Sequence, residues 1–257
     1  MSGDTPAKPD RRPDPWARLR AATPARIGLG RAGDGLPTRA VLEFQHAHAL
    51  ARDAVHAPLD PDRVAAQLDG LPCLRVRSRA GDRTTYLQRP DLGRRLDPDS
   101  AATLPAGPYD VVYVIADGLS ATAVHAHAAP VLRAVLDRLP GWRTGPVVLA
   151  AQARVALGDA VGERMGAALV AVLIGERPGL SAADSLGVYV TYAPQAGRLD
   201  SERNCISNIR PPDGLSHAAA ADKLAWLLTE ARTRRLTGVG LKDEGAVLGG
   251  PAGPPIP

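Results

Sequence analysis

Residues 167–180 read AALVAVLIGERPGL, and they carry the strongest signal for the fold class. Residues 167–174 are all apolar and show no alternation, which is typical of a strand covered on both faces in a parallel sheet. The run stops at GERPG, where Pro178 cannot donate to a strand ladder. Ligands of open α/β sheets bind at the carboxyl ends of strands, so Glu176 is a candidate binding residue. The alternative is that Glu176 and Arg177 form only a solvated ion pair at a turn.

The second half of the chain alternates strand patterns with helix patterns around this stretch. Strands are expected at 110–116, 146–150, 167–174 and 187–193, and helices at 120–139, 154–165 and 216–235. This order predicts a doubly wound, Rossmann-like α/β domain over residues 106–244.

The chain before residue 106 has a different pattern. An apolar stripe at helical spacing predicts an amphipathic helix over 38–55, and a short helix and an alternating, half-exposed strand follow at 62–68 and 74–78. We expect a small, mainly helical domain over residues 25–105. Residues 1–24 and 245–257 are rich in proline with charged residues or glycine, and are predicted to be disordered tails.

The net charge of +4 is concentrated in an arginine arm, residues 71–97, with seven arginines and three aspartates. Tyr86 is the only aromatic residue there, so nucleic-acid binding is not expected, and a protein interface or a solvated face remains. The two cysteines, Cys73 and Cys205, have no C-x-x-C partner, which fits a reducing cytoplasm. No apolar run is long enough to predict a membrane span.

Several motifs look functional but have simpler explanations. The glycines of 28–33 match G-x-G-x-x-G, yet no strand pattern precedes them and the helix pattern starts later, so a dinucleotide site is not predicted. Ser120 with Asp117 and His125 could indicate a hydrolase, but G-x-S-x-G is incomplete and Ser120 is a good helix cap. We expect no catalytic residue and no metal ligand, which fits a chain that supplies only part of a site.

Six blocks, in the same order along residues 24–241, resemble the small (light) subunit of ethanolamine ammonia-lyase. They are RIGLGRAG (26–33), ARDAV (51–55), YLQRPDLGR (86–94), ADGLS (116–120), IGERPGL (174–180) and NCISNIR (204–210). The two ends of the chain depart from the family.

The resemblance implies an adenosylcobalamin-dependent lyase that converts ethanolamine to acetaldehyde and ammonia by a radical mechanism. In this family a large barrel subunit holds the substrate, and the small subunit closes over the corrin in a hetero-oligomer. The cobalamin keeps its own dimethylbenzimidazole base, in keeping with the absence of an Asp-x-His-x-x-Gly motif here. The resemblance also implies a cytoplasmic enzyme, with a bacterial microcompartment as an alternative location.

The family's corrin contacts fall on Val155, Glu176 and Cys205 of this sequence. Glu176 would accept hydrogen bonds from the amides at the corrin rim, while Val155 and Cys205 would supply packing and main-chain contacts. Without the resemblance, Cys205 would be interpreted as a buried core thiol. Two other classes stay open: a stand-alone nucleotide-binding enzyme that uses the turn at 117–120, and a non-catalytic adaptor that binds a partner through the arginine arm.

Overall fold

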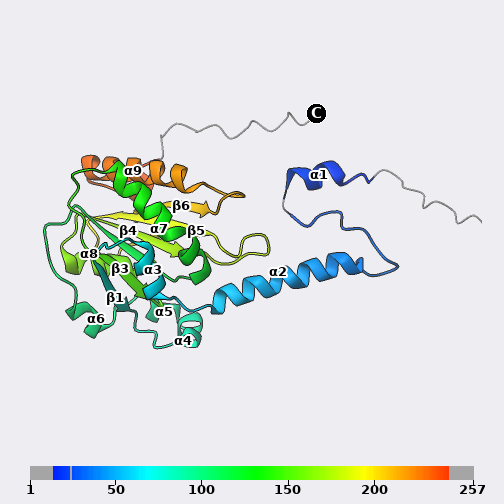
Figure 1. Ribbon diagram of the computed structural model, residues 1–257, viewed down its shortest axis with the longest axis horizontal. Helices are drawn as coiled ribbons and strands as arrows, with labels where there is room; N and C mark the ends of the chain where they lie inside the picture. The colour runs from blue at the N-terminus through cyan, green and yellow to red at the C-terminus, as the bar shows by residue number, and fades with distance from the viewer. Residues whose placement is uncertain (1–13, 24, 243–257) are drawn as a thin grey trace, which may run out of the picture. The chain divides into compact units, whose positions relative to one another are not determined.

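The computed structural model describes residues 14–23 and 25–242 (Figure 1). They form two compact units, one ending at Ala49 and one starting at Leu50, so that the division falls within helix α2 (Thr38–His56). Of the predicted tails, only residues 14–23 are described, and they include helix α1 (Ala17–Ala22). The rest of both tails lies outside the described residues.

The first unit contains no buried residue among those described. Between its helices, Gly28, Gly30 and Gly33 adopt left-handed backbone with φ of 56°, 80° and 64°. Within residues 14–23 and 25–27, no strand precedes these glycines, and the next helix begins only at Thr38. This local context differs from the strand, turn and helix that a dinucleotide-binding G-x-G-x-x-G needs.

The second unit is built on one six-stranded sheet with the order β1-β3-β2-β4-β5-β6. Its strands are β1 (Cys73–Arg77), β2 (Val111–Ala116), β3 (Val147–Ala151), β4 (Leu169–Gly175), β5 (Leu186–Tyr192) and β6 (Asn204–Ile209). The first four in the order are parallel, whereas β5 is antiparallel to β4 and to β6.

The α/β class predicted from the sequence is confirmed, but the sheet is mixed, and the Rossmann-like arrangement is not confirmed. The reason lies in the connection between β4 and β5. Residues 176–185 contain no helix, so the chain returns beside β4 in the opposite direction instead of crossing over. The polar edge strand β6 was not predicted, because NCISNI lacks an apolar pattern.

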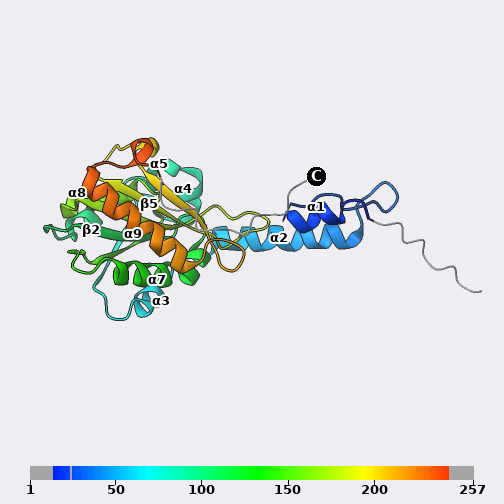
Figure 2. The ribbon, with the colours of Figure 1, turned by 90° about the horizontal axis from the view of Figure 1, so that it is seen from above.

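Both faces of the sheet are covered, as the unbroken apolar runs predicted. In β2, Val111, Tyr113 and Ile115 pack with helices α3 (Pro61–Gln67), α7 (Ala121–Arg138) and α9 (His217–Arg234). The alternate residues Val112 and Val114 pack on the other face with α8 (Leu157–Met165), and Figure 2 shows these helices from above. Alternate residues of β4 divide in the same way, so the stretch from which the sequence argument started is a central strand.

Residues 25–105 are not confirmed as a separate helical domain. Strand β1 pairs with β3 at the edge of the main sheet, and its alternating arginines lie on the exposed side of the strand. Three short helices follow: α4 (Arg83–Gln88), α5 (Pro90–Gly93) and α6 (Pro98–Ala102). Single 3₁₀ turns occur at η1 (Asp200–Glu202) and η2 (Gly238–Gly240). None of the helices in the described part of the chain has the length and apolar character to cross a bilayer.

Candidate functional site

A cleft of about 410 Å³ lies at the carboxyl ends of strands β2 and β4. This is the edge at which the sequence argument placed a ligand. Five segments of the second unit line it: Tyr86, Gly118, Leu119, Arg154, Val155, Ile174, Gly175, Glu176, Arg177 and Tyr189. Val155 and Glu176 therefore share one cleft, although they are 21 positions apart in the sequence, with helix α8 and strand β4 between them.

The wall of the cleft depends on close backbone contact between two turns. The amide of Leu119 donates to the carbonyl of Gly175 at 2.9 Å. A Cβ at Gly118 would collide with the Gly175 carbonyl, and a Cβ at Gly175 would collide with the Ser120 carbonyl. Glycine at both positions lets the ends of β2 and β4 approach, so the cleft has a main-chain wall with little side-chain cover.

Glu176 is half-buried and bonds to two segments that follow it in the chain. Its Oε2 accepts from the Ser185 hydroxyl at 2.5 Å and from the Asn208 amide at 3.2 Å. No ion pair within 4 Å joins Glu176 to Arg177 among the described residues, so the structure does not support the ion-pair alternative. The carboxylate is instead held at the cleft by the start of β5 and the end of β6.

Cys205 lies on the edge strand β6 and is not part of the cleft lining. It is paired in register with Tyr189 of β5, so its thiol and that phenol lie on neighbouring strands. Tyr189 itself lines the cleft, so it links Cys205 to Glu176 and Val155. Although Cys205 is exposed as a residue, desolvation of its thiol by neighbouring atoms and the Glu176 carboxylate raise its pKa. The thiol is therefore protonated at neutral pH and is a weak nucleophile.

The floor of the cleft is a stack that the sequence analysis missed. Tyr86 is fully buried and its hydroxyl donates to the carbonyl of Ala153 at 3.1 Å. The guanidinium groups of Arg83 and Arg154 lie 4.8 and 4.4 Å from the centre of its ring. Gly93 packs so closely on the same ring that a Cβ there would collide with it. The block YLQRPDLGR was the available signal, because its tyrosine, Tyr86, and its glycine, Gly93, are the residues that pack together.

The Asp117, Ser120 and His125 group does not form a catalytic triad. Ser120 caps α7 by accepting from the Ala123 amide, and its hydroxyl donates to the carbonyl of Ala183 at 2.9 Å. His125 Nε2 instead accepts from the Asp60 amide at 2.9 Å. The interpretation of Ser120 as a helix cap is confirmed.

Asp117 is a buried structural anchor. Its carboxylate accepts from the amides of Gln152 and Ala153 at 2.8 and 2.9 Å, and Arg83 lies 3.5 Å away. Burial raises the pKa of Asp117, and these bonds oppose that effect. The carboxylate thus fixes the segment that leads from β3 to Val155. Among the described residues, no group of three or more histidine, cysteine or acidic side chains is placed to hold a metal ion.

Comparison with known proteins gives a family for this chain. The family model for the ethanolamine ammonia-lyase light chain (EutC) matches residues 13–242. The small subunit from Azotobacter vinelandii is 54% identical over 257 residues, covering 96% of this chain and 93% of the relative. The small subunits from Ralstonia nicotianae and Xanthomonas campestris pv. campestris are 55% and 56% identical, covering 95% and 93% of this chain and 93% and 91% of the relatives. The chain therefore belongs to the ethanolamine ammonia-lyase light-chain family, and it is a subunit of an ammonia-lyase.

Proposed function

We propose that this chain is the small subunit of an adenosylcobalamin-dependent ethanolamine ammonia-lyase and closes over the corrin at the interface with a large barrel subunit. The reaction is the conversion of ethanolamine to acetaldehyde and ammonia by a radical mechanism. The observation that carries the proposal is that Val155 and Glu176 line one cleft at the carboxyl edge of the sheet, in a chain of this family.

The residues of the cleft fit one face of a corrin. A corrin is a broad apolar disc with amide groups around its rim, so it needs small or apolar side chains, main-chain groups and a few acceptors. In the cleft, Leu119, Val155 and the main-chain wall at Gly118 and Gly175 would contact the apolar disc, and Glu176 would accept from the rim amides. The cleft is open on one side, which fits a group that a second subunit covers from the opposite face.

Each of the three contact residues has a distinct role in the proposal. Glu176 accepts from rim amides with a carboxylate that Ser185 and Asn208 already orient, so little side-chain entropy is lost on binding. Val155, half-buried against the α8 side of the core, gives an apolar contact. Cys205 reaches the cofactor from the neighbouring strand as a neutral thiol beside Tyr189.

When bound, adenosylcobalamin supplies the radical chemistry through its cobalt–carbon bond. This chain's own contribution is to bind, orient and shield that group from water. The described residues include no nucleophile and base in the geometry of a catalytic pair at the cleft, and the substrate site belongs to the large subunit in this proposal. The proposed location is the cytoplasm, with a microcompartment as the alternative.

The test is co-expression of this chain with an ethanolamine ammonia-lyase large subunit from the same organism, in cells supplied with cobalamin. We expect the two chains to co-purify with corrin absorbance in the visible range and to release ammonia from ethanolamine. The isolated chain with adenosylcobalamin should show no turnover. Turnover by the isolated chain would contradict the proposal and favour a stand-alone enzyme, while a complex that lacks corrin would favour an adaptor.

A further inference from the structure

A second and larger cleft, of about 840 Å³, lies on the α8 side of the sheet. One wall comes from the arginine arm and α6, the second from α8, and the third from residues 196–200. The lining residues are Arg79, Arg94, Arg95, Leu96, Ala101, Ala156, Ala160, Glu163, Arg164 and Ala196 to Asp200. Neither the resemblance nor the proposed cofactor site accounts for this cleft.

The cleft combines an apolar floor with a cationic rim. Small and aliphatic side chains such as Leu96, Ala101 and Ala160 form the floor, and Leu199 of the third wall adds an aliphatic side chain that is 66% exposed. The two sides of the rim carry arginines, of which Arg79 and Arg95 are exposed and form no ion pair within 4 Å in the described part of the chain. A ligand for this surface must therefore bring both aliphatic groups and negative charge.

Other arginines of the arm are already paired and lie outside this cleft. Arg75 pairs with Asp62, and Arg89 forms a two-point pair with Asp91 at 2.9 Å for both bonds. Arg83 points inward to Asp117. The uncompensated charge of the arm is thus concentrated at the cleft rim.

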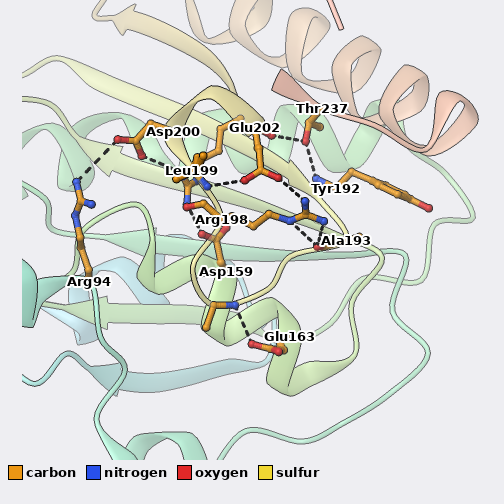
Figure 3. Close-up of polar contacts among 12 residues, drawn as sticks. Arg94, Asp159, Glu163, Tyr192, Ala193, Arg198, Leu199, Asp200, Glu202 and Thr237 are labelled. Carbon is orange, nitrogen blue, oxygen red and sulfur yellow. Dashed lines mark hydrogen bonds and ion pairs between the residues drawn. The ribbon is translucent and has the colours of Figure 1, made fainter. Parts of the chain in front are cut away.

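The third wall is preorganised by a polar network, drawn in Figure 3. Arg198 donates to Glu202 and to the carbonyl of Ala193, and the Ala196 amide donates to Glu163 of α8 at 2.9 Å. Asp200 lies 3.9 Å from Arg94 across the cleft.

A buried ion pair anchors this network beneath the wall. Arg203 pairs with Asp159, and both side chains are only 1% exposed. Arg203 also donates to Asp200 at 2.8 Å. A binding partner therefore meets a formed surface and does not have to order the 196–200 segment.

The second cleft adjoins the proposed cofactor cleft along the chain and in space. Val155 lines the first and Ala156 lines the second, and the arm passes from Gly93, packed on the floor tyrosine, directly to Arg94 on the rim. A subunit that covers the first cleft would reach the second one with its neighbouring surface.

We infer that this second cleft is the docking site for an acidic segment of the large subunit, with aliphatic side chains on the floor and carboxylates on Arg79 and Arg95. The inference rests on the proposed function and specifies its interface. A nucleotide fits less well, because no aromatic side chain lines the cleft to stack on a base and an apolar floor gives nothing to phosphate. Arginine binds carboxylates in a two-point geometry, which gives a peptide a fixed register.

The first test is the double charge reversal Arg79→Glu with Arg95→Glu in the full chain. Its matched control is Arg75→Glu with Arg89→Glu, which makes the same change in net charge on the same arm outside the cleft. We expect the cleft variant to weaken binding to the large subunit about tenfold or more at low salt, with a smaller loss at high salt, and the control to change binding less than about threefold. Circular dichroism and urea unfolding of both variants check that the fold is retained.

The second test replaces Leu199 with a photo-crosslinking amino acid in the assembled complex. We expect a crosslinked peptide from the large subunit that contains aspartate or glutamate beside aliphatic residues. A crosslink to a second copy of this chain, no crosslink, or equal binding by the cleft and control variants would overturn the inference. If one of these contrary results were found while the wild-type complex assembled and held corrin, the docking inference would be wrong and the proposed function would remain supported. If the wild-type chains did not assemble, both the docking inference and the proposed function would be contradicted.

Discussion

Glu176 and Ser185 bond to each other twice across the segment that joins β4 to β5. The Glu176 amide donates to the Ser185 carbonyl at 2.9 Å, and the Ser185 hydroxyl donates to Glu176 Oε2 at 2.5 Å. The segment between them is thereby closed at its base, where β5 starts its antiparallel course. The same contact aims the carboxylate at the cleft, so the turn that makes the sheet mixed also positions the proposed corrin contact.

Glu176→Gln should weaken cobalamin binding to the assembled complex. The amide keeps the size of the side chain and one acceptor oxygen, but it loses the charge that strengthens bonds from the corrin rim. The expected loss is about 1–3 kcal/mol, or roughly tenfold or more in affinity. Titration of the reconstituted complex with cobalamin measures it.

The matched control is Glu230→Gln on α9. Glu230 does not line the cleft, and its carboxylate accepts from Arg234 Nε at 2.7 Å. Asp184 is a poorer control, because it lies 3.9 Å from both His127 and Arg210 beside the same loop. Equal affinities for wild type and Glu176→Gln would mean that Glu176 serves only to close the turn with Ser185.

Cys205 should react slowly with thiol reagents. Desolvation and the Glu176 carboxylate raise its pKa, so the thiolate fraction at pH 7.5 is below that of a free cysteine peptide. The measurement is the rate of iodoacetamide modification, followed by mass spectrometry of the Cys205 peptide, with Cys73→Ser as the background. A rate above that of the peptide would contradict the neutral-thiol role and point to a nucleophile.

Asp159→Ala should destabilise the chain strongly. It leaves the buried Arg203 guanidinium with only Asp200 as an acidic partner, and removal of one member of a buried pair typically costs about 3–5 kcal/mol. Urea unfolding of the isolated chain measures this free energy. Asp222→Ala removes the partner of Arg138 in a pair that is partly exposed, so it should cost less than about 1 kcal/mol.

A double variant, Asp159→Leu with Arg203→Met, separates charge from packing. We expect it to recover much of the lost stability, since no buried charge is then left without a partner. No recovery would show that the hydrogen bonds from Arg203 to the 198–200 segment, and not the buried charge, carry the stability.

The stability of the chain should fall as the pH drops below 6.5. His127 Nδ1 lies 3.0 Å from His217 Nε2, and burial lowers the pKa of both rings from the ordinary value of 6.5. The mutual repulsion of the two rings and Arg210 lower the pKa of His127 further, while Asp184 raises it. Because these pKa values are lower in the folded chain, the unfolded chain binds protons first as the pH falls. The stability that is present above pH 6.5 is therefore lost as the pH falls from 6.5 toward the pKa values of the two rings in the folded chain.

His217→Asn should reduce this loss, because one of the two coupled rings is gone. The free energy of unfolding in urea at pH 7.5 and pH 5.5 gives the comparison, with His46→Asn on α2 as an exposed control. If wild type and His217→Asn lost the same stability between these two pH values, the histidine pair would not be the cause.

The sequence alone determined the elements with strong local patterns and the family. The apolar run of β4 required cover on both faces, and Ser120 marked the start of α7, because periodicity and capping act within a few residues. The blocks GERPG and YLQRPDLGR carried the family resemblance and pointed to Glu176. The strand and the helix start can be predicted from the sequence because interactions between residues close together in the chain determine them.

The tertiary structure alone decided the mixed sheet and the shape of the site. The antiparallel return of β5 and the pairing of the polar strand β6 depend on contacts between segments that have no local signal. The hydrogen bond that holds Tyr86 in the floor joins it to Ala153, 67 positions away in the sequence. The buried pair joins Asp159 to Arg203, 44 positions away. Which distant groups meet is set by how the two faces of the sheet pack as a whole, and no periodicity within either segment encodes it.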